Sequence, residues 1–344
     1  MRAISKFAAA AAAVLLGSAL TCPPATAQDA GADSFSFAVI GDTPYGDAAV
    51  ASFPSHIRDL NADRGLSFVS HLGDIKNGST VCSDAYFARI KTDFDTFTHP
   101  LVYTPGDNEW TDCHRPNNGG YNPLERLDKI RRTFFARPGT TLGATMPVRS
   151  QAARGLPENV QFTRNRVAFT AVNVPGSNNS LDPWTGLGKS APTPEQQAEV
   201  ASRTAAVIAE LHSTFAAARQ RKDRAVVVMQ QADMFDPTWA VTWNEFSAFK
   251  PIVDALVRES NSFDGPVYLF NGDSHVYNTD RPLAAGSKWL DFYSEPGHAD
   301  NLQRITIDGS SRATDYLRVE VAPDGVRGRG ADVLSFSRVP FAGR

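Results

Sequence analysis

The segment Phe35–Ile40 (FSFAVI) runs directly into Gly41–Gly46 (GDTPYG), so an apolar run of strand length ends in a glycine and a carboxylate. Short apolar runs bounded by such polar residues are typical of buried β-strands. The same arrangement recurs along the chain at Leu66–Leu72 before Gly73-Asp74, Pro100–Thr104 before Gly106-Asp107, Ala225–Met229 before Gln230, and Pro266–Phe270 before Gly272-Asp273-Ser274-His275. A glycine ahead of each carboxylate allows a sharp turn and a close approach to a ligand.

Longer amphipathic stretches separate these strands and predict helices at about 47–62, 83–97, 123–136, 194–220 and 243–260. Alternation of strands and helices predicts an α/β layer fold. Further strands are expected at 160–163 and 166–172, joined by a turn at Arg164-Asn165, and at 302–308 and 314–321. The polar segment 138–158 is interpreted as an irregular surface excursion. We therefore expect one α/β domain with two sheets face to face and helices outside.

In an open α/β sheet the carboxyl ends of the strands line one crevice. The residues expected at that rim are Asp42, Asp74, Asp107, Gln230, Asp273 and His275. Four carboxylates this close would repel one another, and one or two divalent cations would remove that repulsion. A single Gly-Asp pair is more simply a turn, and Asp308-Gly309 and Asp324-Gly325 are interpreted as turns only. Five strand ends of this kind favour a metal site.

The spacing of these motifs resembles the calcineurin-like metallophosphoesterases over about residues 35–320. The resemblance implies a four-layer α/β-β-α sandwich of the metallo-dependent phosphatase type. It also implies two metals bridged by Asp74, with Asp42 and His275 on one and Asp107, Gln230 and Asp273 on the other. The implied activity is hydrolysis of a small phosphoester by a metal-bound hydroxide.

Several positions depart from the family pattern. Pro44 stands where the family has a ligand histidine; the neighbouring Tyr45 either replaces it or packs in the interior. Asn108 takes the place of the histidine that protonates the leaving group. His114, on the following loop, either supplies this proton or is an ordinary loop histidine. Gln230 and Asp273 replace two histidines, so oxygen donors dominate the second site and favour Mg²⁺, Mn²⁺ or Ca²⁺, while Zn²⁺ or iron suits the His275 site.

Three other polar positions require interpretation. Asn173 and Asn178 follow a strand in an amide-rich run and either bind substrate oxygens or form a turn. His71 lies inside a strand and is expected to be a hydrogen-bonded core residue. Any role at the site would be to contact Asp74 rather than to bind a metal itself.

The N-terminus carries the three-part pattern of an export signal: basic Arg2 and Lys6, the apolar run 8–20, and Ala25-Thr26-Ala27 before the expected cleavage site. A lipid-modified Cys22 is the weaker alternative. The expected organisation is a signal peptide at 1–27 and a single domain at 28–344, periplasmic or secreted. In an oxidising compartment the remaining pair, Cys82 and Cys113, is expected to form a disulfide, the alternative being two buried thiols.

The formal net charge of −3 and the lack of a basic patch give no nucleic-acid-binding signature. The apolar run at the N-terminus is too short for a membrane-spanning helix. Two functions remain: a metal-dependent phosphoesterase, and a catalytically weak or inactive protein that binds a metal or phosphate on the same scaffold. Phosphomonoesters, phosphodiesters and nucleotides are all compatible with the first.

Overall fold

The computed structural model describes Met1 and residues 34–342, and the predicted signal segment 1–27 lies almost entirely outside them. All the elements described below belong to one compact unit of mixed α/β structure. Within residues 34–342 no helix combines the length and the apolar character needed to cross a membrane.

The first sheet has six strands in the order β13-β12-β1-β2-β3-β4. Their bounds are β1 Phe35–Ile40, β2 Leu66–His71, β3 Pro100–Tyr103, β4 Leu142–Gly143, β12 Asp315–Val321 and β13 Leu334–Pro340. The three central strands, β1, β2 and β3, are parallel, and β12, β13 and β4 are antiparallel to their neighbours.

The second sheet has seven strands in the order β10-β11-β9-β8-β7-β6-β5. Their bounds are β5 Arg149–Gln151, β6 Leu156–Arg164, β7 Val167–Ala171, β8 Ala225–Met229, β9 Val267–Asn271, β10 Asn278–Asp280 and β11 Leu302–Thr306. Strands β7, β8, β9 and β11 are parallel. Each sheet thus has a parallel centre with antiparallel edges, and both centres deliver loops at their carboxyl ends.

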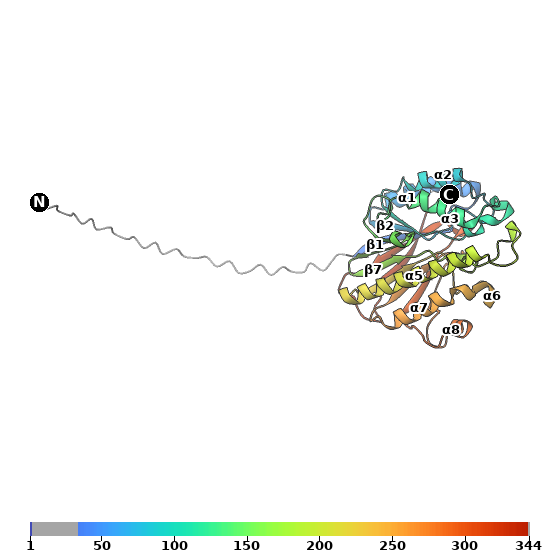
Figure 1. Ribbon diagram of the computed structural model, residues 1–344. Coiled ribbons are helices and arrows are strands. Elements are labelled where there is room, and N and C mark those ends of the chain that lie inside the picture. Colours follow the sequence, from blue (N-terminus) through green and yellow to red (C-terminus); the bar gives the residue numbers. More distant parts are fainter. Residues whose placement is uncertain (2–33, 343–344) are drawn as a thin grey trace. The chain divides into compact units, whose positions relative to one another are not determined.

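Three apolar clusters hold these elements together. One contains side chains of both sheets, including Phe37 and Phe68 from the first and Phe169 and Phe270 from the second. A second joins the other face of the first sheet to its helices, and a third joins the other face of the second sheet to α5 and α7. The two sheets therefore face each other, and helices cover the outer faces (Figure 1).

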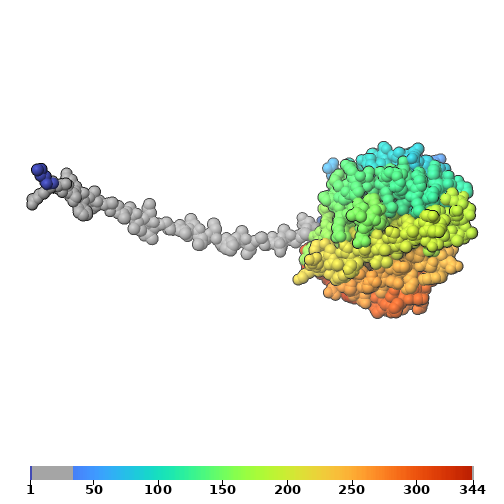
Figure 2. Space-filling view, viewed as in Figure 1, coloured from blue at the N-terminus to red at the C-terminus, as the bar shows by residue number. Residues whose placement is uncertain are grey.

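The helices are α1 Gly46–Ala62, α2 Asp84–Phe94, α3 Pro123–Phe134, α4 Gly176–Ser180, α5 Pro194–Arg221, α6 Trp243–Phe246, α7 Lys250–Asn261 and α8 Lys288–Tyr293. Helix α5 starts with a capping box, in which Thr193 and Gln196 satisfy each other's backbone N–H groups, and with Pro194 in its first turn. Surface from the first half of the chain, cyan to green, lies above surface from the second half in Figure 2.

The predicted strands and most predicted helices are present, with four corrections. The turn between β6 and β7 is Asn165-Arg166, both with positive φ, so β7 begins one residue later than predicted. The stretch 243–260 is two helices, α6 and α7, separated by a short 3-10 turn. The segment 138–158 contains β4, β5 and the start of β6, and the edge strands β10 and β13 were not predicted at all. These missed strands lie at sheet edges, where few side chains are buried.

We expect Phe37→Ala to lower the free energy of unfolding by about 3–5 kcal/mol. Phe37 is fully buried, stacks on Phe68 at 4.7 Å between ring centroids, and meets Phe169 and Phe270 edge-on from the other sheet. Urea denaturation followed by circular dichroism measures the change. The control is Phe35→Ala in the same strand, which is partly exposed and should cost less. Equal losses for the two variants would contradict the central place given to Phe37.

Candidate functional site

Three of the predicted metal ligands form a tight group. Asp42 follows β1, Asp74 follows β2 and His275 follows β9, and one ligand atom of each lies within 4.8 Å of the other two. The two carboxylates are buried, whereas the His275 side chain is 33% exposed and forms the open side of the group. The imidazole Nε2 lies 3.2 Å from Asp42 Oδ1. The group thus combines two buried carboxylates with one accessible nitrogen.

The hydroxyl of Tyr45 lies among these three residues. It donates a 2.6 Å hydrogen bond to Asp74 Oδ2 and lies 3.4 Å from His275 Nε2 and 3.5 Å from Asp42 Oδ1. Tyr45 is therefore not simply a packing residue, which was one of its two interpretations. Burial, followed by the charges of Asp74 and Asp42, raises its pKa well above the ordinary value, so the phenol stays protonated.

The carboxyl groups of this site resist ionisation in the absence of a cation. Burial is the largest cause that raises the pKa of Asp42, Asp74 and Asp273, and neighbouring carboxylates, Asp107 among them, raise it further. For His275, burial by itself lowers the pKa, but its hydrogen bond with Asp42 raises the pKa above the ordinary value overall. The imidazolium of His275 therefore does not by itself make ionisation of these carboxyl groups favourable.

Two glycines permit the close spacing of the carboxylates. A Cβ on Gly272 would lie 2.0 Å from Asp42 Oδ2, and a Cβ on Gly106 would lie 2.1 Å from Asp74 Oδ1. Asp42, Asp74, Asp273 and His275 themselves adopt positive φ, between 48° and 70°. Non-glycine residues in this region are uncommon and are concentrated at functional sites.

Asp107 and Asp273 border the site together. A Cβ on Gly176 would lie 2.6 Å from Asp107 Oδ2 and 3.0 Å from Asp273 Oδ2, so both carboxylates flank this glycine. The backbone N–H of Asp273 donates to both oxygens of Asp42 at 3.1 and 3.2 Å, which joins this pair to the first group. Asp233, itself paired with the buried Arg304, donates its N–H to Asp273 Oδ2.

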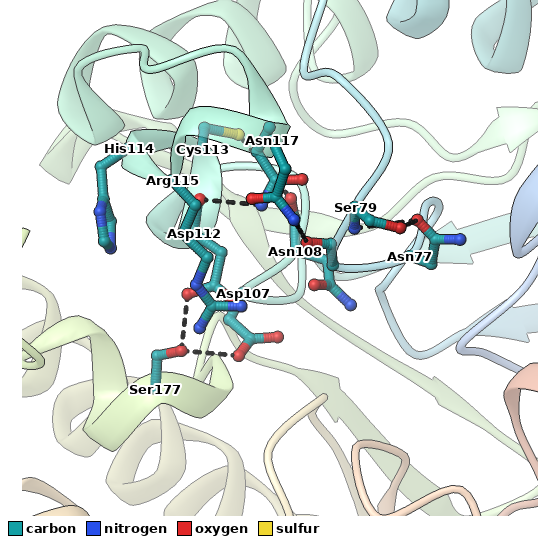
Figure 3. Close-up of polar contacts among 12 residues, drawn as sticks. Asn77, Ser79, Asp107, Asn108, Asp112, Cys113, His114, Arg115, Asn117 and Ser177 are labelled. Carbon is teal, nitrogen blue, oxygen red and sulfur yellow. Dashed lines mark hydrogen bonds and ion pairs between the residues drawn. The ribbon is translucent and has the colours of Figure 1, made fainter. Parts of the chain in front are cut away.

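The Ser177 hydroxyl lies between two carboxyl groups (Figure 3). Its oxygen is 2.9 Å from Asp107 Oδ2 and 2.8 Å from Asp112 Oδ1. Because a hydroxyl has one proton to donate, both contacts are hydrogen bonds only if one carboxyl is protonated. Burial, together with the charge of Asp107, raises the pKa of Asp112 to about 7, which makes Asp112 the protonated partner below that pH.

Gln231, rather than the predicted Gln230, contacts Asp107. Gln231 Nε2 donates to Asp107 Oδ1 at 3.2 Å, and its Oε1 accepts from the N–H of Gly176 at 2.6 Å. Gln230 instead donates to the carbonyl of Ala232, and its buried Oε1 has no hydrogen-bond partner among the described residues. Side chains alternate between the two faces of β8, and Ala225, Val227 and Met229 face the other sheet. Continuing that alternation brings Gln231 to the site.

Glu109 and Lys76 form hydrogen bonds with the backbone of the loops that carry the site residues, a role that the sequence did not reveal. Glu109 Oε1 accepts from the N–H groups of Asp74 and Gly106 at 3.1 and 2.8 Å and from the Tyr103 hydroxyl at 2.8 Å. Lys76 is fully buried and donates to the carbonyls of Asn77 and Asn108. Burial lowers the Lys76 pKa to about 8. The ammonium is therefore an internal cation beside the carboxylates.

The two residues proposed for proton transfer have different positions. Asn108 lies in the site, where its Nδ2 donates to Asp74 Oδ2 at 2.6 Å and to the Tyr45 hydroxyl at 2.9 Å. Both amide hydrogens are thus engaged in orienting Asp74 and Tyr45. His114 lies apart from Asp107 in Figure 3, and its Nδ1 accepts from the N–H of Gly186. Burial lowers the pKa of His114 to about 4, so it is neutral at physiological pH.

The two amides predicted to bind substrate also differ in position. Asn173 is fully buried, and its side chain donates to Glu158 rather than to a carboxylate of the site. Asn178 lines a cavity beside the site, although its side chain bonds to the backbone of Asn244 and Ala248.

His71 bonds to the carbonyl of Thr43 and packs among Phe53, Phe94 and Tyr103, and burial lowers its pKa to about 4; it is the predicted core histidine. The interpretation of Asp308-Gly309 as a turn only is wrong. A Cβ on Gly309 would lie 2.4 Å from Asp42 Cβ and 2.9 Å from His275 Cδ2, so this turn forms a wall of the site.

The predicted disulfide between Cys82 and Cys113 is present, with Cα atoms 5.8 Å apart. It connects the loop after β2, which carries Asp74, to the loop after β3, which carries Asp107. Together with the finding on membrane spans, the disulfide is compatible with the predicted extracytoplasmic location.

The donor set fits a divalent cation. Asp42, Asp74, His275 and Tyr45 offer carboxylate, imidazole and phenol donors to one region, and no Lys or Arg side chain forms an ion pair with these carboxylates within residues 34–342. Buried charges ordinarily pair with an opposite charge or coordinate a metal. The raised pKa values of these carboxyl groups are compatible with a cation as their partner.

Comparison with known proteins adds little. No family model matches this chain, and no curated protein matches it. A solved structure described as "GAP50 the anchor in the inner membrane complex of Plasmodium" is similar over 90% of both chains, with a TM-score of 0.44 and 10% sequence identity. A similarity at this level supports no conclusion about the fold or function of this chain.

We expect loss of the disulfide to lower the free energy of unfolding by about 3–4 kcal/mol on the chain-entropy model. The cysteines are 31 residues apart, and the bond reduces the number of conformations that the unfolded chain can adopt. Denaturant titration of Cys82→Ser/Cys113→Ser against the oxidised wild type gives the value. As a control, reductant should destabilise the wild type and leave the double variant unchanged. A double variant as stable as the oxidised wild type would refute the expectation.

We expect the chelated protein to lose stability as pH rises from about 4 upward. The carboxyls of Asp42, Asp74 and Asp273 have a raised pKa in the fold, against about 3.9 in an unfolded chain. At a pH above the unfolded pKa and below the raised folded pKa, the folded state binds more protons than the unfolded state. The free energy of unfolding therefore falls as the pH rises through this range. A cation replaces these protons, and at 100 times its Kd should restore about 3 kcal/mol.

Thermal unfolding in EDTA and in excess Mg²⁺ or Mn²⁺, at pH 5 and pH 8, measures this effect. The stabilisation by cation should be larger at pH 8. Asp74→Asn should reduce it, and Asp332→Asn, on an exposed loop, should behave like the wild type. An equal gain at both pH values would count against a cation site made of these carboxylates.

Proposed function

We propose that this chain is an exported, metal-dependent hydrolase of small phosphoesters, with the four-layer architecture of the calcineurin-like metallophosphoesterases. One observation carries the proposal: Asp42, Asp74 and His275, from three different strand ends, present ligand atoms within 4.8 Å of one another. The order of the glycine-carboxylate motifs along the chain and the parallel centres of both sheets support it.

Asp42, Asp74 and His275 would hold the first cation, with Tyr45 as the nearest additional donor. Asp107 and Asp273 offer carboxylate oxygens around Gly176, and with Asp74 they would form a second, harder site, in which Gln231 holds Asp107 through its Nε2. Oxygen donors favour Mg²⁺, Ca²⁺ and Mn²⁺, while the imidazole of His275 also suits Zn²⁺ or iron. When bound, such cations neutralise phosphoryl oxygens and make water more acidic.

Hydrolysis adds a water oxygen to phosphorus and breaks the bond from phosphorus to the ester oxygen. That ester oxygen leaves with the electron pair and gains a proton. Asn108 uses both amide hydrogens to fix Asp74 and Tyr45, and His114 contacts Gly186 on another loop, so neither is placed to donate that proton. The site therefore suits esters whose leaving group needs little protonation, or protonation by solvent.

The engagement of Asn108 also favours the second candidate, a protein that binds a metal or phosphate with little turnover. The two candidates share the same site and differ only in catalysis. Retention of cation affinity without hydrolysis of any phosphoester would favour the binding protein.

We expect the chelated protein to hydrolyse p-nitrophenyl phosphate or bis(p-nitrophenyl) phosphate after addition of Mg²⁺, Mn²⁺ or Ca²⁺, and less well with Zn²⁺ alone. Asp42→Asn and Asp74→Asn should lower kcat/KM at least about 100-fold, and Tyr45→Phe about 10–100-fold. Steady-state assays with calorimetric titration of each cation test this, with Asp332→Asn as control. Unchanged activity in both ligand variants, or full activity with Zn²⁺ only, would refute the assignment.

A further inference from the structure

A cavity of about 290 Å³ adjoins the carboxylate site. It shares Gly176, Ser177 and Asp273 with that site and extends toward the segment that carries α6. Ligand cavities usually begin at about 300 Å³, so this volume suits one small organic group rather than a polymer. Because the cavity opens beside the reacting centre, its walls would contact the part of a substrate next to the phosphorus.

The polar side of this cavity is negatively charged. Asp182, Asp236, Glu245 and Asp273 line it, and no Lys, Arg or His does. Within residues 34–342 none of these four carboxylates forms an ion pair with Lys or Arg. Asp236 accepts from Thr238 and Trp239, and Glu245 accepts from Thr242, but these donors are neutral and leave the charges in place.

This charge does not rely on Asp273, because burial and neighbouring carboxylates raise the pKa of that carboxyl well above its usual range. Burial, followed by the charge of Asp107, raises the pKa of Asp182 to about 6, so Asp182 is ionised above that pH. Asp182 follows Ser177, whose carbonyl accepts its N–H, and this contact holds it at the border between the cavity and the Asp107 side of the site.

The other side of the cavity is aromatic. Trp239, Phe246 and Phe249 line it, and Trp239 is 49% exposed although it is among the largest apolar side chains of the protein. The indole N–H donates to Asp236 Oδ2 at 3.0 Å, which fixes the ring beside a carboxylate. An accessible aromatic ring held next to unpaired carboxylates matches the chemistry that binds organic cations.

We propose that this cavity binds the ammonium group of the substrate, so that the preferred substrates are phosphoesters of small amino alcohols, with quaternary amines such as choline favoured. The proposal rests on the proposed function for the phosphoester half of the substrate. The inference about the ammonium group rests on the cavity alone.

Two other occupants fit less well. A third divalent cation would need oxygen ligands around it, and Trp239, Phe246 and Phe249 supply none. A neutral flat group could stack on Trp239, but the unpaired carboxylates would then be desolvated without a compensating charge. A cationic group satisfies the aromatic and the acidic wall together.

Binding can be tested without turnover. Choline is titrated into the full mature protein and followed by tryptophan fluorescence and calorimetry, with its uncharged isostere 3,3-dimethylbutanol as the comparison. Choline should bind at least about tenfold more tightly than the isostere. Trp239→Leu and Asp182→Asn/Glu245→Gln should remove that preference; glutamine at 245 retains the capping box with Thr242.

Trp243→Leu is the matched control, because Trp243 is 44% exposed but does not line the cavity. It should bind choline like the wild type. Equal binding of choline and the isostere, or an unchanged Kd in Trp239→Leu, would overturn the proposal. The proposal would also be overturned if Mg²⁺ competed with choline in both the wild type and Trp239→Leu, because the cavity would then be a metal site.

Catalysis provides the second test. Phosphocholine should exceed 3,3-dimethylbutyl phosphate in kcat/KM by about tenfold, and Trp239→Leu should reduce the ratio toward one. Hydrolysis of both esters at equal rates by the wild type would refute the ammonium pocket while the phosphoesterase proposal stands. Selective choline binding without hydrolysis of any ester would refute the phosphoesterase proposal while the ammonium pocket stands.

Discussion

Repulsion between buried carboxylates is the constraint on which the rest of this structure depends. Asp42, Asp74, Asp107 and Asp273 come from four strand ends and meet where the parallel centres of the two sheets deliver their loops. Such a group is unfavourable in isolation, since each charge raises the cost of ionising the next. The surrounding protein offsets part of this cost through the buried ammonium of Lys76, the backbone N–H of Asp273 and the amide of Asn108. The proposed cation would offset the remainder.

The arrangement of the two sheets explains why so much of this site could be predicted. The strands β1, β2, β3, β8 and β9 are short apolar runs that end in a polar residue, and the rule that ligands bind at the carboxyl ends of parallel strands then places Asp42, Asp74, Asp107, Asp273 and His275 together. The rule says which strand ends meet, but not which side chain faces inward. Both faces of β8 are apolar, so the sequence did not distinguish Gln231 from Gln230.

Contacts between segments far apart in the chain account for the other differences. Tyr45 and Asp74 are 29 residues apart, and Gly309 approaches Asp42 from a turn near the C-terminus, so no local pattern indicates either contact. Glu109 lies inside a recognised motif, yet its function is to bind two backbone N–H groups, which only the folded loops reveal. Edge strands such as β13 alternate weakly between buried and exposed side chains, and their Ser, Arg and Pro residues resemble a loop.

The left-handed backbone of Asp42, Asp74, Asp273 and His275 restricts the chemistry that substitution can explore at this site. Valine, isoleucine and threonine are disfavoured there by their backbone alone, whatever room their side chains have. Asparagine tolerates this conformation as readily as aspartate and has nearly the same shape. Exchange of aspartate for asparagine therefore separates charge from geometry at these positions. For the same reason, gradual change of the ligand set should pass through asparagine, glycine and histidine rather than through the wider range of residues.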